Sequence, residues 1–355
     1  GWRQLRDLCD SLQNLSDIES ILDIDRTLWY LAYTNAFVIL DSYLGNAKHN
    51  YYVYQDHHGR FMPIIWDLNG GLGIFNRPAS GINYTVAQMQ NMSPMLHATD
   101  SMWPLVKNIL SIPMYKRMYF AHMKTILQEN ISDSSYYALG LNLQSIIDTA
   151  VFSDIHKFGT YAQFQTNLIN NVVIGPKTVP GITFLMEARE DYLVNTPEFL
   201  APQPSITSIQ TSTSYPIIFS SIFITAIVSN ANTVFLGVRN SVLGLFNKMP
   251  MFDDGAHGDG VAGDGIYGVS VPVTSSQMQY YIYAENNNAG KFSPARAEHE
   301  FHTLTANSSI LAKGDLVINE LLAINTMNTM NANGDFNDWI ELYNTGSTSV
   351  NLLGF

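Results

Sequence analysis

The hydrophobic period of this chain changes near Pro202, from the repeat of helices to the pattern of short strands. Between Ile21 and Ile39, apolar residues recur at intervals of three and four, which predicts a helix with one buried face. The same repeat predicts further helices over 102–111, 113–129, 134–151, 160–171 and 182–194. After the proline-flanked linker APQPSITSIQ, which starts at Ala201, short apolar runs such as IFITAIV alternate with Gly, Asn and Asp turns. One packing pattern cannot satisfy both periods, so the chain is predicted to be multidomain.

This change of pattern predicts three units. Residues 1–200 form a mainly helical, α+β unit with one hairpin, and residues 201–305 form an all-β sandwich. A third unit, 314–355, contains the strands DLVINELLA and DWIELYN but is too short to close the second sandwich that they imply. At 355 residues the chain exceeds the size of a single hydrophobic core, which agrees with this division.

The composition excludes several classes of protein. Apolar residues make up 46% of the chain and charged residues 14%, as in packed globular domains. The net charge of −12 argues against a nucleic-acid partner, because such partners need clustered positive charge. Cys9 is the only cysteine, so no intrachain disulfide can form. The most apolar segment, PIIFSSIFITAIV from Pro216, has 13 residues, fewer than the roughly 20 that a transmembrane helix needs.

The stretch DSYLGN places Asp41 five residues before Asn46. In protein kinases this spacing sets a proton-accepting Asp beside an Asn that holds magnesium. A second metal-binding Asp is then needed after a hairpin, and Asp67 stands there, after NYYVYQD, a turn at His58 and Gly59, and RFMPIIWDL. Asp-x4-Asn alone is common at helix ends and turns, but the order of the three elements favours phosphoryl transfer.

The run from Asp41 to Gly73 resembles the core signature of kinases of the CotH (spore-coat protein H) type. The segments WPLVKNILSIPMYKRMYFAHMKTIL, from Trp103, and PGITFLMEAREDYL, from Pro180, are similar to the C-terminal half of that family. The resemblance covers residues 1–200 and implies the C-terminal lobe of an atypical protein kinase. It also implies transfer of the ATP γ-phosphate to Ser or Thr of secreted or surface proteins in bacteria.

The resemblance assigns roles by position. Asp41 would be the catalytic base, Asn46 and Asp67 would hold magnesium and the phosphates of ATP, and Asn69 would assist them. His49 and Asn50 are expected to shape the loop.

We expect Trp66 to pack in the core rather than contact nucleotide. Because the chain starts at Gly1 without Met and ends at Phe355 in a strand pattern, we expect an internal part of a longer protein. The N-terminal lobe of the family would precede it, so this part is not expected to turn over ATP alone.

A second acidic segment, FDDGAHGDGVAGDGIYG, runs from Phe252 to Gly268. Its carboxylates alternate with glycines and permit two interpretations: a calcium site, or a turn whose side chains cap their own backbone. The order of an EF-hand is missing. The segment resembles a loop of immunoglobulin-like modules in bacterial surface proteins. The candidate calcium ligands are Asp253, Asp254, Asp259 and Asp264.

The end of the chain resembles the start of a lamin-tail domain, which is also an immunoglobulin-like sandwich. Asp338, Trp339, Glu341 and Asn344 occupy the D-W-I-E-L-x-N run of that family. We expect Trp339 to be a core residue, because amphipathic strands bury their aromatic face.

Two functions follow from these observations. The first is a secreted or cell-surface protein kinase that uses ATP and Mg²⁺ on an unknown protein substrate. The second is a non-catalytic adhesion or carbohydrate-associated protein, in which a kinase-like scaffold carries calcium-binding β modules that recognise a glycan or a cell surface.

Overall fold

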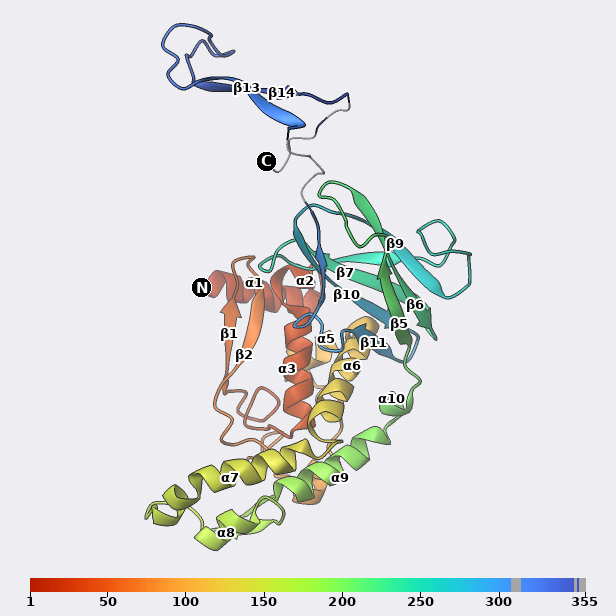
Figure 1. Ribbon diagram of the computed structural model, residues 1–355. Coiled ribbons are helices and arrows are strands. Elements are labelled where there is room, and N and C mark those ends of the chain that lie inside the picture. The colour runs from red at the N-terminus through yellow and green to blue at the C-terminus, as the bar shows by residue number, and fades with distance from the viewer. Residues whose placement is uncertain (308–313, 348–349, 351–355) are drawn as a thin grey trace.

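The computed structural model describes residues 1–307, 314–347 and 350, and it contains a helical part, a β-sandwich and a separate hairpin (Figure 1). At the centre of the helical part, α3 (Ile24–Ala36) packs side by side with α6 (Pro113–Asn130), and the sandwich lies at one end of this pair. The predicted order, a mainly helical lobe followed by a β-sandwich, is confirmed.

The remaining helices are α1 (Trp2–Asn14), α2 (Ile18–Ile21), α4 (Val86–Gln90), α5 (Pro104–Ile109), α7 (Ser135–Ser153), α8 (Tyr161–Thr166), α9 (Ile182–Val194) and α10 (Pro197–Leu200). All six predicted helices are present, although α3, α5 and α8 are shorter than predicted. The first was predicted from Ile21, but α3 begins at Ile24, because Asp23 pairs with the carbonyl of Phe61 and its side chain caps the helix. α8 ends early because the Asn167 side chain donates to backbone carbonyls beyond it.

The predicted hairpin is confirmed as β1 (Tyr51–Gln55) and β2 (Phe61–Ile65), which pair antiparallel from Tyr51 opposite Ile65 to Gln55 opposite Phe61. A second, short hairpin of β3 (Val172–Ile174) and β4 (Lys177–Val179) follows α8. β2 packs against α3, so the hairpin and the central helix hold the chain between them in place.

The sandwich consists of two antiparallel sheets. One has the order β11-β10-β7-β8 with β12 also paired to β10, and the other has the order β5-β6-β9. In β6, every second residue is buried, as expected for a strand that faces a core on one side. The strands are β5 (Ser205–Thr211), β6 (Ser221–Ser229), β7 (Thr233–Arg239), β8 (Asn247–Met251), β9 (Ile266–Pro272), β10 (Gln277–Glu285), β11 (Gly290–Ser293) and β12 (His302–Thr305).

The sandwich shares a hydrophobic core with the helical part. Tyr281, Tyr283, Phe292 and Ala297 are buried in the same apolar cluster as residues of α3 and α6. A bidentate ion pair joins Arg117 of α6 to Glu285 of β10, with N–O distances of 2.9 and 2.8 Å. The two parts are therefore packed against each other and are not merely tethered by a linker.

The last two strands, β13 (Leu316–Leu322) and β14 (Trp339–Asn344), lie where strands were predicted, and they pair antiparallel with each other. The expectation that Trp339 lies in a core is wrong for the described chain, where the residue is only half-buried and its neighbour Ile340 is 64% exposed. Two strands have no second sheet to cover them. Part of the predicted third unit, residues 348–349 and 351–355, lies outside the described residues. Across the described residues, no helix has both the length and the hydropathy needed to cross a membrane.

Candidate functional site

The turn that carries Asp41 and Asn46 follows α3 and is fixed by its own backbone. A Cβ placed on Gly45 would lie 1.7 Å from the carbonyl oxygen of Leu40, so only glycine fits there. The Ser42 hydroxyl donates to the Ile39 carbonyl at 2.5 Å. The turn thus presents both polar side chains from a rigid base.

The Asp41 carboxylate lies between two segments. Its side chain is 16% exposed, and its Oδ1 lies 3.3 Å from Nε2 of His49. On the other side it meets Gly70, where an added Cβ would come within 2.4 Å of Oδ2. Gly70 follows Asp67 by three residues, so the structure brings the predicted base against the predicted metal-binding loop.

Asn46 has an unsatisfied oxygen. Its backbone N–H donates to the Arg77 carbonyl at 3.0 Å, but its side-chain Oδ1 is shielded from solvent and has no hydrogen-bond partner. A buried acceptor without a partner costs about 1–3 kcal/mol, so a cation or donor at this oxygen would stabilise the turn.

Asp67 and Asn69 are exposed at the start of the second loop. Oδ1 of Asp67 accepts only a long hydrogen bond, 3.4 Å, from the Asn69 N–H. Within the described chain, no hydrogen bond or ion pair joins Asp41, Asn46 and Asp67 to one another. Their donor set of carboxylate and amide oxygens is the one that Mg²⁺ prefers, so these residues fit the predicted ion.

The backbone around the site is strained. Val38, Lys48, Asn50, Asp67 and Leu72 all have left-handed φ values, between 46° and 56°. Such values are unfavourable for residues other than glycine, and most of all for β-branched valine. The Gly73 N–H donates to the Val38 carbonyl at 3.1 Å and so ties the two loops together. Strain of this kind persists only where the surrounding structure holds it, which is typical of functional sites.

The expectation that Trp66 packs in the core is wrong, since its side chain is 57% exposed. The Trp66 N–H donates to the Asn50 carbonyl at 3.2 Å, which extends the hairpin by one residue and turns the indole outward. There it meets Tyr52 edge to face, with ring centroids 5.3 Å apart. Tyr52, Val53 and Tyr54 are all exposed on β1, so this end of the hairpin presents aromatic side chains to solvent beside Asp67.

A second aromatic group lies behind Asn46. The Lys48 ammonium lies 3.9 Å from the ring centre of Trp103, on which His97 is stacked at 3.5 Å. Burial lowers the pKa of His97, although its hydrogen bond to the Leu44 carbonyl opposes this effect. Nothing in the sequence linked Trp103 to Lys48, because 54 residues separate them.

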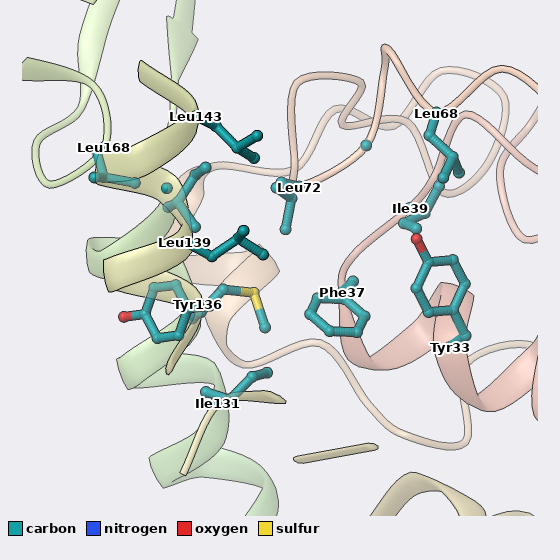
Figure 2. Close-up of a pocket in the computed structure, with 14 residues that line it drawn as sticks. Tyr33, Phe37, Ile39, Leu68, Leu72, Ile131, Tyr136, Leu139, Leu143 and Leu168 are labelled. Carbon is teal, nitrogen blue, oxygen red and sulfur yellow. The ribbon is translucent and has the colours of Figure 1, made fainter. Parts of the chain in front are cut away.

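An apolar cavity of about 340 Å³ lies beside the 67–73 loop (Figure 2). Leu68 and Leu72 of the loop and Phe37 after α3 line one side, and Leu139 and Leu143 of α7 line the other. No charged side chain lines it, so it does not suit a phosphate. It lies next to the metal-binding loop rather than forming part of the polar site.

The Asp-Gly segment between β8 and β9 has a different arrangement. Asp259 is fully buried, and its two oxygens accept three backbone N–H groups at 2.6–2.7 Å. Asp253 likewise accepts the N–H groups of Gly263, Asp264 and Gly265. Hydrogen bonding therefore favours the capping interpretation over the calcium interpretation.

One potential cation cluster is nevertheless present in this segment. Ligand atoms of Asp254, His257 and Asp259 lie within 4.8 Å of one another. Asp254 bonds to Nδ1 of His257 at 2.9 Å, and the oxygens of Asp264 accept from Val261 and Ile266. Asp253, Asp259 and Asp264 thus use both carboxylate oxygens within the loop, and Asp254 uses its Oδ1.

Comparison with known proteins agrees with the division of the chain into a helical part and a β-sandwich. Residues 2–173 match the family described as CotH kinase protein, and residues 230–284 match the second immunoglobulin-like domain of conditioned medium factor. A search of curated proteins found no match. Among solved structures, an endo-beta-1,4-mannanase from Thermotoga petrophila is similar at 14% identity over 37% of this chain, with a TM-score of 0.19. This chain spans 24% of that structure, and a likeness at that score supports no argument.

Proposed function

The chain carries a CotH kinase region at residues 2–173 followed by an immunoglobulin-like region at residues 230–284, and from this we propose that the protein transfers the γ-phosphate of ATP to Ser or Thr of a protein substrate. The observation that carries the proposal is the packing of the Asp41 carboxylate against Gly70, in the loop that begins at Asp67. This contact supports the proposal, because phosphoryl transfer needs a proton acceptor close to the loop that would carry a cation ligand.

In the proposed reaction, the substrate hydroxyl oxygen forms a bond to the γ-phosphorus while the bond to the departing ADP oxygen breaks. Asp41 accepts the hydroxyl proton. His49 is its positioning residue, because the 3.3 Å contact from Nε2 holds one carboxylate oxygen and leaves the other facing the loop. Catalysis then consists of positioning and charge neutralisation, with no covalent enzyme intermediate.

Asn46 and Asp67 would hold the magnesium ion, and Asn69 lies two residues beyond Asp67 to assist them. When bound, Mg²⁺ neutralises the charge on the phosphate oxygens. The Asn46 Oδ1 supports this assignment, because it is buried without a hydrogen-bond partner and is therefore free to bind a cation. The exposed Tyr52–Trp66 pair would stack the base of the nucleotide.

The natural place of action that we propose is outside the cell or at the cell surface. Its support is the combination of a CotH region with an immunoglobulin-like region. The same combination favours the second candidate, a non-catalytic surface protein whose β module binds a glycan or a cell-surface ligand. The two candidates differ in whether the protein binds nucleotide.

Calorimetric titration of the full-length protein with Mg²⁺-ATP, together with a phosphotransfer assay, tests the proposal. We expect Asp67→Ala to weaken binding by roughly 100-fold, the loss expected for a charged contact of about 3 kcal/mol. Asp154→Ala is the matched control, because Asp154 also accepts an N–H from the residue two positions on but lies beyond α7. Absence of nucleotide binding in the unmodified protein would overturn the proposal and favour the second candidate.

A further inference from the structure

The sandwich meets the helical part at a partly buried polar cluster, here called the joint, which consists of Asp25, His122, Tyr281, Glu298 and His299. Asp25 is near the start of α3 and His122 is in the middle of α6, whereas the other three residues belong to the sandwich side. This end of α3 and α6 lies against the sandwich in Figure 1. Asp25, His122 and Tyr281 are buried, whereas Glu298 is half-buried and His299 is exposed at the edge of the contact. The buried polar groups must find partners among themselves, because they have little access to water.

His122 occupies the centre of the joint and is completely buried. Its ring is stacked between Trp29 of the helical part, at 4.2 Å, and Phe292 of the sandwich, at 4.9 Å. Its Nε2 lies 2.9 Å from Oδ1 of Asp25, while its Nδ1 is buried without a partner. The Trp29 indole N–H donates to the Ala297 carbonyl at 3.3 Å and completes the contact.

Glu298 brings a second carboxyl group to Asp25. Its backbone N–H donates to Oδ2 of Asp25 at 3.2 Å, and its own Oε1 accepts the Tyr281 hydroxyl at 2.8 Å. Both acids line one small polar cavity of about 60 Å³. Two ionised carboxylates in so small a space repel each other, and burial also disfavours their charge.

Other charged groups surround this cavity from every element that packs there. Arg239 on β7 and Lys248 on β8 face Glu298 electrostatically, and His299 lies 3.9 Å from Asp25. From the helical part come Asp23, Arg26 and Arg60, of which Arg60 pairs with Asp23 at 3.1 Å. Lys248 pairs with Glu19 and Arg60 pairs with Asp23, and among the described residues no cation forms an ion pair with Glu298 within 4.0 Å.

We propose that the joint is a proton-coupled latch, in which the Glu298 carboxyl takes up a proton when the sandwich docks on α3 and α6. Docking then weakens as the pH rises. The helix α3 connects this joint to the segment that precedes Asp41. The latch itself does not depend on phosphotransfer.

The electrostatics of the docked state agree with this direction. Burial, followed by the charge of Asp25, raises the pKa of Glu298 from 4.5 to about 8. The docked form therefore holds an extra proton between these pH values, and the docking constant falls by up to about tenfold per pH unit in that window.

His299 acts in the opposite direction, because burial lowers its pKa below 6.5 despite the nearby Asp25. The stabilisation of docking by His299 is therefore lost as the pH falls below 6.5. Measurements above pH 6.5 thus report the effect of Glu298 without that of His299.

The test is urea unfolding of the full chain at pH 6.5 and 8.5, together with hydrogen exchange of the segment 296–300. For the unmodified protein, we expect the unfolding constant to rise by roughly tenfold or more over this interval. Glu298→Gln keeps an acceptor for Tyr281 but cannot titrate, so its unfolding constant should change much less. Glu300→Gln, an exposed neighbour that pairs with Arg296, is the matched control and should behave like the unmodified protein.

Equal pH dependence in Glu298→Gln and the unmodified protein would overturn the latch. If Glu298→Gln does not fold, Tyr281→Phe provides the second variant. It removes a hydrogen bond that lowers the pKa of Glu298, so the loss of protection at 296–300 should move to higher pH. If Tyr281→Phe loses its protection at 296–300 at the same pH as the unmodified protein, that result would also contradict the proposal.

Discussion

Two segments of this protein combine Asp residues with glycines but have opposite hydrogen bonding. In residues 41–73, the Asn46 side-chain oxygen has no partner and Asp67 accepts one long hydrogen bond. In residues 252–268, the Asp259 oxygens accept three short ones from their own loop. Composition alone cannot separate these cases. The number of side-chain oxygens without a hydrogen-bond partner does separate them, because a ligand site needs oxygens that are not already used in hydrogen bonds within the protein.

The glycines differ in the same way. At position 70 only glycine fits, because the Asp41 carboxylate lies where the Cβ of any other residue would be. Gly263 and Gly265 are needed for conformation, since both have positive φ values, of 81° and 85°, that bring the loop around Asp253. In the first segment glycine brings two loops together, and in the second it lets one loop fold back on itself.

Gly70→Ala tests the first half of this comparison and should have the largest effect. The new Cβ would come within 2.4 Å of Asp41 Oδ2 and push the carboxylate away from its place. A misplacement of about 1 Å in a reacting group costs about 100-fold in rate, so phosphotransfer should fall by roughly that factor. The assay is the initial rate at saturating Mg²⁺-ATP.

Gly71→Ala is the control for this variant, because its Cβ meets nothing closer than the Leu68 carbonyl oxygen at 3.1 Å. Equal rates in the two variants would show that the contact between Asp41 and Gly70 has no part in positioning the base.

Asp259→Asn tests the second half through stability. An amide has only one acceptor oxygen, so at least one of the three loop N–H groups loses its partner, at a cost of about 1–3 kcal/mol in the free energy of unfolding. Asp264→Asn should cost less, because Asp264 is exposed and water can replace its partners. Urea unfolding of both variants at pH 7 measures the difference, and an equal loss in the two would contradict the capping role.

The stabilisation that Asp259 contributes should also depend on pH, in one direction. Burial by itself would raise the pKa of Asp259, but the N–H groups of Gly255 and His257 outweigh it and lower the pKa below 3.8. The stabilisation by Asp259 is therefore complete above pH 3.8 and is lost as the pH falls through the lower, folded value. The Asn variant should lack this acid-dependent part.

Much of the fold was predictable from the sequence, because its elements are local. The helices over 113–129 and 182–194 agree with α6 and α9 to within a residue, since proline and glycine fix where each begins. The hairpin before Asp67 followed from its alternating aromatics. Trp66 was misplaced because one added backbone hydrogen bond decides which face the indole takes, and periodicity does not show that bond.

The joint between the two parts could not be predicted. Asp25 and His122 are 97 residues apart, and Glu298 follows much later, so no local pattern links them. The same holds for the contact between Asp41 and Gly70, although the order of the motifs implied that their loops meet. Sequence spacing predicts which residues belong to a site, but long-range packing decides which of their atoms remain free.

Calcium addition is the smallest expected effect and the sharpest test of the comparison. A site occupied at 100 times its dissociation constant would gain about 2.7 kcal/mol. For a chain of this size, that gain would raise the melting temperature by roughly 4 °C. Because Asp253, Asp254, Asp259 and Asp264 already accept hydrogen bonds within the loop, we expect a change of less than about 1 °C between millimolar calcium and EDTA. Differential scanning calorimetry measures it, with Asp10→Asn as a control for loss of one exposed acid. A rise of several degrees that disappears in Asp254→Asn would show that the cluster of Asp254, His257 and Asp259 binds the ion, and would remove the distinction between the two segments.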